Sequence, residues 1–387
     1  MPKGKLTSPV RYGVVGVGGM GKGHCRNLGE TPDACLTAVC DIIPAVAEEV
    51  GKLHNVPYFV KHTGLIASGL CDAVIVSTPH PEHPRVAIDA MKAGLHLLCE
   101  KPLSERVSTA DKILAAARET GVAFCVDFQK RTQPVFIKAM EIVRNGELGR
   151  VFRTAMICPN YRTQGYYDSG GWRATWAYEG GGVMMNQSPH DLDIFYLLGG
   201  KPASVFGRVE TRLHDIEVED VAEAMLTYPD GGTGYFHTST IESGPGYMIE
   251  VFGDKGKLVY RDNALRFYRF DTPITEFTRT CPDMWNKPKC VEVPLEIPKE
   301  PKRKGPVIYN FTRHLLYGEP LAVPGETAIH SLEIANAVWL SAHLGKPVTL
   351  PISRRAYDIF LAKKRRESTF VKKVGKKVKA LTDPSLV

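Results

Sequence analysis

Apolar and polar positions divide the chain into two stretches that repeat in different ways. In the first, from residue 10 to about 128, short apolar runs alternate with segments whose apolar residues recur at helical spacing. The runs typical of buried strands are 10–16, 34–41, 73–78, 95–99 and 122–128. The segments typical of helices are 21–28, 44–54, 83–93 and 109–119. Strands that alternate with helices of this length predict a doubly wound parallel sheet with helices on both faces.

The second stretch begins with a predicted helix at 134–144 and is then rich in strand-like segments. These segments are 151–158, 204–212, 222–228, 234–240, 247–252, 257–260 and 265–270. Helical patterns return at 189–198 and at 325–343. Strands in such close succession favour a mostly antiparallel open sheet. We therefore predict a Rossmann domain over residues 1–130 and an α+β domain over residues 131–387, and a chain of 387 residues is long enough for both.

The positive charge of the chain is concentrated near its C-terminus. The formal net charge is +7, but residues 354–379 hold eleven Lys and Arg against two acidic residues, which leaves −2 for the rest. This distribution argues against a nucleic-acid-binding body. The apolar residues of this basic tail recur at helical spacing: Phe370, Val371, Val374, Val378 and Leu381. They fit a helix that closes the domain or contacts another subunit, although Gly375 weakens the pattern; the alternative is binding to an anionic surface.

Nine cysteines are scattered along the chain, and no two form a C-x-x-C pair. Several lie within apolar runs, as Cys99 and Cys125 do, so we expect free thiols in a reducing compartment and no metal site. A disulfide between Cys281 and Cys290 is the alternative. The N-terminus shows no apolar leader, and no apolar run approaches the ~20 residues of a membrane span. We therefore expect a cytoplasmic protein.

The turn after the first expected strand carries Gly16, Gly18 and Gly21, with Gly19 and Met20 between the last two. The first glycine permits a tight turn, the second lets the backbone approach a pyrophosphate, and the third lets the helix pack on the strand. The helix that follows offers free N–H groups and a partial positive charge to phosphates. The loop therefore predicts a dinucleotide site.

Asp41 ends the second expected strand, 20 positions after Gly21. An acidic residue at about this distance binds the ribose hydroxyls of a dinucleotide and repels a 2′-phosphate. No Lys or Arg follows directly, so we predict NAD and consider NADP less favoured. A simple helix cap is the alternative role for this residue.

The third expected strand leads into a second group of cofactor candidates: Ser77, Thr78, Pro79 and His80. In a doubly wound sheet, the carboxyl end of this strand is where the nicotinamide half of the cofactor passes.

Further motifs follow. Glu100-Lys101-Pro102 ends the fourth expected strand, and Gly180-Gly181-Gly182 is followed by His190-Asp191-Leu192-Asp193. Together with the glycine loop, Ser77-Thr78-Pro79 and three less distinctive segments (82–96, 131–134 and 335–348), they resemble the Gfo/Idh/MocA oxidoreductase family. That family includes glucose–fructose oxidoreductase and inositol dehydrogenases. The resemblance covers roughly residues 10 to 352.

The resemblance implies two catalytic residues. Lys101 would lie beside the nicotinamide and hydrogen-bond the reacting oxygen, since burial and cationic neighbours can lower the pKa of a lysine toward working pH. His190 would take the hydroxyl proton, because imidazole titrates near neutrality. The alternatives are a surface lysine and a structural histidine. The same resemblance assigns His83 and Glu100 to the cofactor and Arg131 to the substrate.

One position departs from the family pattern. Many members carry Asp four residues before the histidine, whereas this chain has Asn186. An amide cannot accept a proton but can hydrogen-bond a substrate hydroxyl. Acid–base chemistry therefore falls to Lys101 and His190, and the identity of the substrate stays open.

An aromatic and glycine-rich stretch, 160–176, supplies further substrate candidates: Tyr161, Trp172 and Arg173, with Trp176 nearby. Aromatic faces beside polar groups suit pyranose rings. Packing between domains or between subunits is an equal alternative.

Together these features predict an NAD-dependent oxidoreductase that moves a hydride between nicotinamide and a hydroxyl-bearing carbon of a sugar, glycoside or polyol. One alternative is redox-assisted glycoside cleavage, in which a tightly bound NAD is recycled. A second is a non-catalytic NAD-binding regulator. We expect a small-molecule substrate, no nucleic acid and no membrane span. We also expect a homodimer or homotetramer, because an open antiparallel sheet leaves one face to pair subunits.

Overall fold

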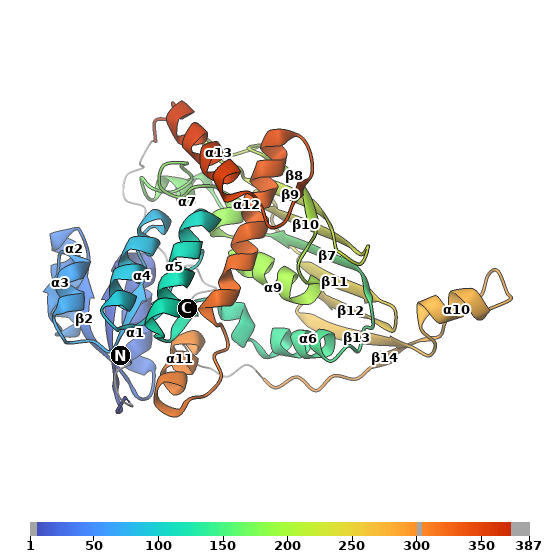
Figure 1. Cartoon of the computed structure of the whole chain (residues 1–387), viewed down its shortest axis with the longest axis horizontal. Helices are drawn as coiled ribbons and strands as arrows, with labels where there is room; N and C mark the ends of the chain where they lie inside the picture. Colours follow the sequence, from blue (N-terminus) through green and yellow to red (C-terminus); the bar gives the residue numbers. More distant parts are fainter. Residues whose placement is uncertain (1–5, 300–303, 373–387) are drawn as a thin grey trace.

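A computed structural model describes residues 6–299 and 304–372 of the chain. Its first third contains a six-stranded parallel sheet in the order β3-β2-β1-β4-β5-β6. This part of the chain is blue to cyan in Figure 1. The strands are β1 (Val10–Val15), β2 (Ala34–Cys40), β3 (Tyr58–Phe59), β4 (Ala73–Val76), β5 (His96–Cys99) and β6 (Phe124–Val126). All the pairings are parallel. The prediction of a doubly wound parallel sheet is confirmed; β3 is an additional edge strand.

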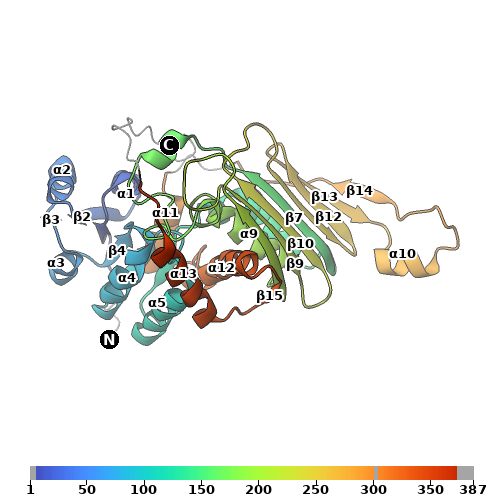
Figure 2. The ribbon, with the colours of Figure 1, turned by 90° about the horizontal axis from the view of Figure 1, so that it is seen from above.

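Helices cover both faces of this sheet. The helices between its strands are α1 (Gly19–Glu30), α2 (Pro44–His54), α3 (His62–Ala67), α4 (His83–Lys92) and α5 (Val107–Thr120). Figure 2 shows α4 and α5 on one face, with α1 on the other. Because the strands are covered on both sides, their apolar runs are continuous: β4, Ala-Val-Ile-Val, is buried at every position.

A late segment of the chain returns to the first sheet. Helix α11 (Pro306–Tyr317), which the sequence did not lead us to expect, packs on β1. The Tyr12 hydroxyl lies 2.8 Å from Thr312 Oγ1 inside the core, and the Tyr12 ring contacts Phe311. Residues on both sides of position 130 therefore contribute to the packing around the first sheet. The division into domains 1–130 and 131–387 stays a prediction.

The second sheet has nine strands in the order β14-β13-β12-β11-β7-β10-β9-β8-β15. They are β7 (Val151–Pro159), β8 (Ser204–Glu210), β9 (Val221–Thr227), β10 (Thr233–Ser239), β11 (Met248–Gly253), β12 (Gly256–Arg261), β13 (Ala264–Phe270), β14 (Cys290–Val293) and β15 (Val348–Thr349). The β7–β10 pair is parallel and the others are antiparallel. The prediction of a mostly antiparallel second sheet is confirmed.

Helices α9 (Pro189–Gly199) and α12 (Ile329–Leu344) lie between the two sheets (Figures 1 and 2). Helix α6 (Pro134–Arg144) runs along the lower end of the second sheet in Figure 1. Helix α12 packs so closely on β8 that a Cβ on Gly207 would lie 2.5 Å from the Val338 carbonyl. Exposed apolar residues lie on neighbouring strands as cross-strand partners: Phe206 and Met225, then Met225 and Tyr235. The homodimer or homotetramer stays a prediction.

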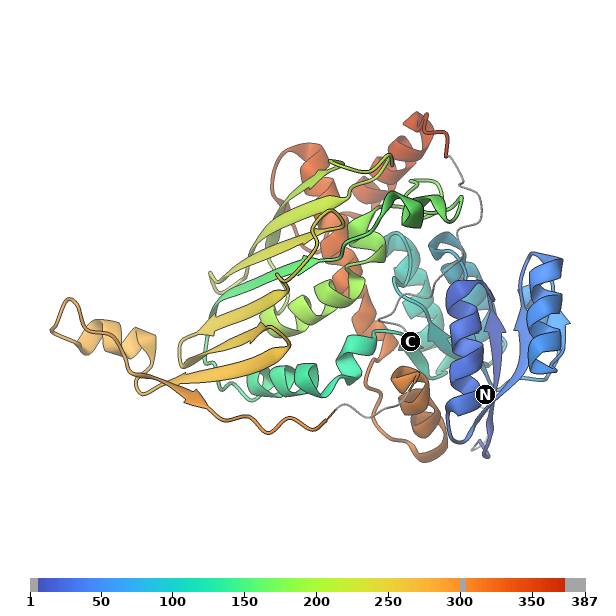
Figure 3. The same cartoon turned by 180° about the vertical axis from the view of Figure 1, so that it is seen from behind.

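Two features lie at the margins of the second sheet. The segment with α10 (Ile274–Thr280) projects from the β13–β14 edge (Figure 3). Helix α13 (Arg354–Glu367), also not expected, packs on α5 and α12, and Arg365 Nε donates to the Trp176 carbonyl at 2.9 Å. Positions 374, 378 and 381 of the predicted amphipathic tail lie outside the described residues.

All nine cysteines are free thiols, so the alternative of a Cys281–Cys290 disulfide is wrong. Among residues 6–299 and 304–372, every helix is too short or too polar to cross a bilayer.

Candidate functional site

The glycine loop after β1 has the geometry that its glycines require. Gly16 has a φ of +86°, and a Cβ there would lie 2.6 Å from the Ser77 carbonyl oxygen. A Cβ on Gly21 would lie 1.9 Å from the Gly16 carbonyl oxygen. Both distances are too short for any side chain. These two glycines therefore bring the start of α1 close against the ends of β1 and β4.

The other two glycines of the loop face open space. A Cβ at Gly18 or Gly19 would meet nothing within 4 Å. The N-cap, Gly18, gives no side-chain hydrogen bond, and the first turn of α1 has no acidic residue. The first N–H groups of α1 are therefore available to an anion, beside the exposed Met20. This arrangement fits the pyrophosphate of a dinucleotide.

Asp41 follows β2 directly, and two backbone amides fix its carboxylate. Val17 N donates to Oδ2 at 3.0 Å and Ile43 N donates to Oδ1 at 2.9 Å. Ile43 is the N-cap of α2, and the helix receives no side-chain cap, so Asp41 does not have the alternative role of a helix cap. Each carboxylate oxygen keeps a lone pair that can accept a ribose hydroxyl.

The end of β4 carries polar groups that the protein itself does not pair. The hydroxyls of Ser77 and Thr78 are buried and have no hydrogen-bond partner among the described residues. The ring nitrogens of His83 lie 2.7 Å from the Thr78 carbonyl and 3.0 Å from the Pro102 carbonyl. His80 Nδ1 lies 3.2 Å from the Glu179 carbonyl, and burial lowers the pKa of His80 to about 3. Buried hydroxyls without partners are unfavourable unless a ligand pairs them, so this strand end fits the polar part of a cofactor.

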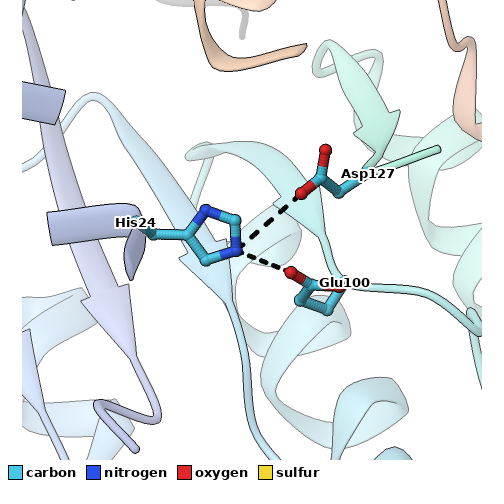
Figure 4. Close-up of side chains that lie close together, drawn as sticks. All are labelled: His24, Glu100 and Asp127. Atoms are coloured by element: carbon cyan, nitrogen blue, oxygen red, sulfur yellow. Dashed lines mark hydrogen bonds and ion pairs between the residues drawn. The ribbon is translucent and has the colours of Figure 1, made fainter. Parts of the chain in front are cut away.

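A buried charged triad lies at the carboxyl edge of the first sheet (Figure 4). His24 Nε2 from α1 lies 2.7 Å from Glu100 Oε1, after β5, and 3.9 Å from Asp127 Oδ2, after β6. Burial would raise the pKa of Glu100, but the hydrogen bond and charge of His24 lower it to about 2. Burial and the Glu100 charge raise the pKa of Asp127 to about 6. One nitrogen or oxygen atom from each of the three side chains lies within 4.8 Å of the others, which is close enough for the group to hold a metal ion. The His24–Glu100 hydrogen bond already pairs the imidazole, however, so we propose that the triad supports Glu100.

Lys101 follows β5 and reaches toward the second half of the chain. Its Nζ donates to the backbone carbonyl of Asn186 at 2.9 Å, and its backbone N donates to Glu100 Oε2 at 3.2 Å. Burial lowers the pKa of Lys101, although the charges of Glu100, Glu179 and Asp127 oppose that change. Lys101 is partly buried and its amine is hydrogen-bonded, unlike the amine of a lysine that is free on the surface.

His190 lies in the first turn of α9, with its ring edge against Phe128 at a centroid distance of 5.8 Å. Its Nδ1 is buried without a partner among the described residues. Burial and the positive charges of Lys101 and Lys130 hold the pKa of His190 well below its ordinary value. The imidazole is therefore neutral at physiological pH and lies within the electrostatic range of Lys101.

Glu179 is a site residue that the sequence analysis missed. The residue is 1% exposed, and its carboxylate accepts hydrogen bonds from Asn186 Nδ2 through one oxygen and from Ala174 N through the other. Burial raises the pKa of Glu179. It is the only acidic residue between Trp172 and Asn186 and directly precedes the glycine triplet, so a search for carboxylates near the motif would have found it.

The glycine triplet is required by packing. A Cβ on Gly181 would lie 2.2 Å from the Trp339 ring, and one on Gly182 would lie 1.9 Å from the Glu219 carbonyl oxygen. The buried Glu219 carboxylate accepts hydrogen bonds from Gly182 N, Met184 N and Trp339 Nε1. Burial raises the pKa of Glu219 to about 7. This glutamate holds the loop that leads into α8 (Val183–Asn186), on which Asn186 lies.

Two of the substrate candidates from the aromatic stretch, Trp172 and Arg173, lie beside the residues described above. Trp172 contacts the His80 ring edge at a centroid distance of 6.1 Å. The Arg173 guanidinium lies 4.5 Å from the Trp172 ring centroid and 4.3 Å from that of Tyr166, and its NH1 donates to the Tyr166 hydroxyl at 2.6 Å.

Three other candidates lie elsewhere. Trp176 is buried against Trp339 and Phe360. Tyr161 is 47% exposed, and its carbonyl accepts a hydrogen bond from Arg162. Arg131, 5% exposed, donates to both carboxylate oxygens of Asp193 and, through NH1, to Thr327 Oγ1 at 2.6 Å. Its donors are engaged inside the protein, so we do not carry Arg131 into the substrate site.

Comparison with known proteins agrees with this arrangement. Residues 10–128 match the model of an oxidoreductase family with an NAD-binding Rossmann fold, and residues 136–259 match the GFO/IDH/MocA C-terminal domain. An uncharacterized oxidoreductase of Bacillus subtilis, YrbE, is 28% identical over 353 residues, which is 89% of this chain and 98% of that protein. The NAD-dependent scyllo-inositol 2-dehydrogenase of the same species is 30% identical over 262 residues, which is 64% of this chain and 73% of that enzyme.

Among solved structures, the WlbA dehydrogenase from Chromobacterium violaceum, in complex with NADH and UDP-GlcNAcA, superposes with a TM-score of 0.77. It is 26% identical, and the match covers 91% of this chain and 99% of that one. These likenesses, with the glycine loop and Asp41, show an NAD-binding oxidoreductase.

Proposed function

Because the chain belongs to the Gfo/Idh/MocA family of NAD-binding oxidoreductases, we propose that it oxidises or reduces one hydroxyl-bearing carbon of a sugar, glycoside or polyol. The observation that carries the proposal is the placement of Lys101. Its partly buried amine donates to the Asn186 carbonyl at 2.9 Å, near the neutral His190 and one residue from the Glu100 triad.

The residues that would hold the cofactor follow from the loop geometry. The α1 amides would bind the pyrophosphate, Asp41 the ribose hydroxyls, and the strand end at Ser77 and Thr78 the nicotinamide half. When bound, NAD supplies the acceptor for a hydride that leaves the substrate carbon. The Asp41 carboxylate favours NAD because it repels a 2′-phosphate.

Lys101 would act on the substrate hydroxyl in two ways. In the oxidative direction its neutral amine accepts the hydroxyl proton as the C–H bond of the same carbon breaks, and the product is a carbonyl compound and an ammonium group. The lowered pKa of Lys101 increases the fraction of neutral amine at working pH. In the reductive direction the ammonium returns the proton to the carbonyl oxygen.

His190 would orient the substrate. Its low pKa makes it a weak proton acceptor, so we transfer the role of base from His190 to Lys101. A neutral imidazole still hydrogen-bonds a hydroxyl. Trp172 and Arg173 would form the side of the site that faces a sugar ring, since an aromatic face and a cationic fork bind ring C–H groups and hydroxyls.

The substrate class draws support from the relatives. One is a scyllo-inositol 2-dehydrogenase, and others are named inositol 2-dehydrogenase and 1,5-anhydro-D-fructose reductase. These substrates share adjacent hydroxyl-bearing carbons on a six-membered ring, which two hydrogen-bonding groups such as Lys101 and His190 can bind together.

The proposal is tested by incubating the purified protein with NAD and a panel of inositols, free sugars and glycosides, while NADH absorbance is followed and products are identified by mass. We expect NADH and a product two hydrogens lighter for at least one ring polyol. Release of an aglycone without NADH would replace net oxidation by redox-assisted cleavage. Absence of both, with NAD bound, would favour the regulator.

A further inference from the structure

One buried carboxylate at the site has no role in the proton transfer described above. Glu179 lies between Trp172 and the glycine triplet, and its three oxygens all accept hydrogen bonds. One carboxylate oxygen accepts from Asn186 Nδ2 and the other from Ala174 N, while the backbone oxygen accepts from His80 Nδ1. The residue therefore links the β4 strand end, the aromatic stretch and α8.

The link continues from Asn186 to Lys101. Asn186 offers its side chain to Glu179 and its backbone carbonyl to Lys101 Nζ. The hydrogen bond to Glu179 thus fixes the side chain of Asn186, the last residue of α8, and the backbone carbonyl of the same residue holds the lysine. Loss of the Glu179 hydrogen bond would loosen the end of α8 and with it the backbone carbonyl that Lys101 contacts.

We propose that Glu179 is a positioning residue for Lys101: through Asn186 it fixes the amine, and its charge supplies the carboxylate that position 186 lacks. This inference rests on the proposed function of Lys101 as the proton acceptor. Glu179 would not touch the substrate, since the residue is only 1% exposed.

The charges around the two groups support an electrostatic role. Among the described residues, Glu179 has no ion pair within 4.0 Å, and it shares its surroundings with Lys101 and Arg173. The charged groups that change the pKa of Lys101 are Glu100, Glu179, Asp127 and Arg173. The charge of Lys101 in turn lowers the pKa of the His80 and His190 imidazoles. The Glu100 carboxylate is hydrogen-bonded to His24 at 2.7 Å, and the charge of Glu179 also acts on Lys372, at the end of the described chain.

The sign of the effect follows from these charges. Burial lowers the pKa of Lys101, and the negative charge of Glu179 opposes that change. Removal of the charge should therefore lower the pKa of Lys101 further. Oxidation needs the neutral amine, so the rise of kcat/KM with pH should move to lower pH in a variant without the charge.

The first test replaces Glu179 by an amide of the same shape. In Glu179→Gln, the amide oxygen can still accept from Ala174 N, and Asn186 can rotate its amide to keep a hydrogen bond, so the main change is the loss of charge. The pKa of Lys101 is measured by NMR titration of protein that carries lysine labelled with 13C at Cε, with the signal assigned from Lys101→Arg. We expect a lower titration midpoint, and a kcat about two- to tenfold lower because a less basic amine is a weaker proton acceptor.

The second test reverses the polarity of the pair. The double variant Glu179→Gln with Asn186→Asp returns one carboxylate to the same hydrogen bond, with the amide now donating from position 179. We expect the Lys101 midpoint and most of kcat to return toward wild type. Glu219→Gln is the matched control: it also removes a buried carboxylate that supports the glycine-triplet loop, and it should leave the Lys101 midpoint unchanged.

The outcomes separate this inference from the proposed function. An unchanged Lys101 midpoint in folded Glu179→Gln, or no recovery in the double variant, would overturn it. If Glu179→Gln does not fold, the double variant decides, since a wild-type midpoint there supports the inference and a displaced one contradicts it. If the wild type turns over no substrate on the panel, the proposed function fails, while the NMR titration still decides whether Glu179 sets the state of Lys101.

Discussion

Lys101 Nζ donates to the Asn186 backbone carbonyl at 2.9 Å, across 85 positions of the sequence. Lys101 follows β5 of the parallel sheet, and Asn186 ends α8, in the segment that precedes the strands β8 to β15 of the second sheet. The hydrogen bond therefore joins the cofactor-binding half of the site to the half that would bind the substrate.

Replacement of Lys101 should separate binding from turnover. Lys101→Ala is expected to lower kcat by about 10²- to 10⁴-fold, the usual contribution of a general acid–base group. The affinity for NAD should stay within about twofold, because the loop, Asp41 and α1 are untouched. NAD binding is measured by fluorescence titration and kcat by NADH formation. Lys92→Ala, on the outer end of α4, is the control and should change neither quantity.

Replacement of Asp41 should weaken NAD and relieve the discrimination against NADP. Asp41→Ser removes the charged acceptor fixed by Val17 N and Ile43 N. A hydrogen bond to a charged group contributes about 1.5–3 kcal/mol, so we expect NAD to bind roughly ten- to a hundredfold more weakly. NADP should lose less or gain. Equal losses for both dinucleotides would show that Asp41 does not contact the ribose.

The glycine triplet should tolerate no methyl group at its third position. In Gly182→Ala the new Cβ would lie 1.9 Å from the Glu219 carbonyl oxygen, a backbone atom that cannot move aside cheaply. We expect a loss of about 1–3 kcal/mol in the free energy of unfolding, measured in urea. Gly29→Ala is the control: it lies in α1, its Cβ would meet nothing within 4 Å, and a stabilisation of about 0.5–1 kcal/mol is expected.

The buried Glu219 should make stability depend on pH. Burial raises the pKa of Glu219 from 4.5 to about 7 in the folded protein, so between these values the folded state binds more protons than the unfolded state. Stability from this group is then complete below pH ~4.5 and is lost as pH rises to ~7, by up to about 3 kcal/mol. The free energy of unfolding of the wild type minus that of Glu219→Gln should therefore fall between pH 5 and 8. A constant difference would contradict the raised pKa.

Arg131 should act in stability and not in substrate binding. Its guanidinium is paired with Asp193 inside the protein, and removal of one partner from a buried pair costs about 3–5 kcal/mol. Arg131→Met is expected to lower the free energy of unfolding by this amount. KM, measured at a temperature where the variant is folded, should stay close to that of the wild type. A large rise in KM without loss of stability would return Arg131 to the substrate site.

Most of the fold could be predicted because its signals are local. Continuous apolar runs and glycine turns mark five of the six parallel strands, whereas β3, with only Tyr58 and Phe59, is too short to leave a pattern. Helix α13 was not predicted because most of its residues are polar or charged and its apolar face is narrow. That face consists of Tyr357, Phe360 and Leu361, which recur at helical spacing and are buried. Helix α11 belongs to the first sheet only through tertiary packing, which no local pattern encodes.

The sequence predicted those residues of the candidate site that belong to recognisable motifs. Lys101, His190 and Asn186 lie at motif positions, and the structure places them together. His24, Asp127 and Glu179 were missed because their roles depend on partners: His24 pairs with Glu100, 76 positions away, and Glu179 acts through Asn186. The assignment of Arg131 to the substrate was made without its partner, Asp193, which could be identified only in three dimensions.

The central claim is that a hydride leaves a substrate carbon while Lys101 holds the hydroxyl of the same carbon. The most direct measurement uses the ring polyol that the panel identifies, deuterated at the carbon that is oxidised, with NAD and either the wild type or Lys101→Ala. We predict one deuterium per NADH by mass spectrometry with the wild type, and almost no labelled NADH with the variant although it binds NAD. Unlabelled NADH from the wild type, or labelled NADH formed at the wild-type rate by Lys101→Ala, would contradict the account.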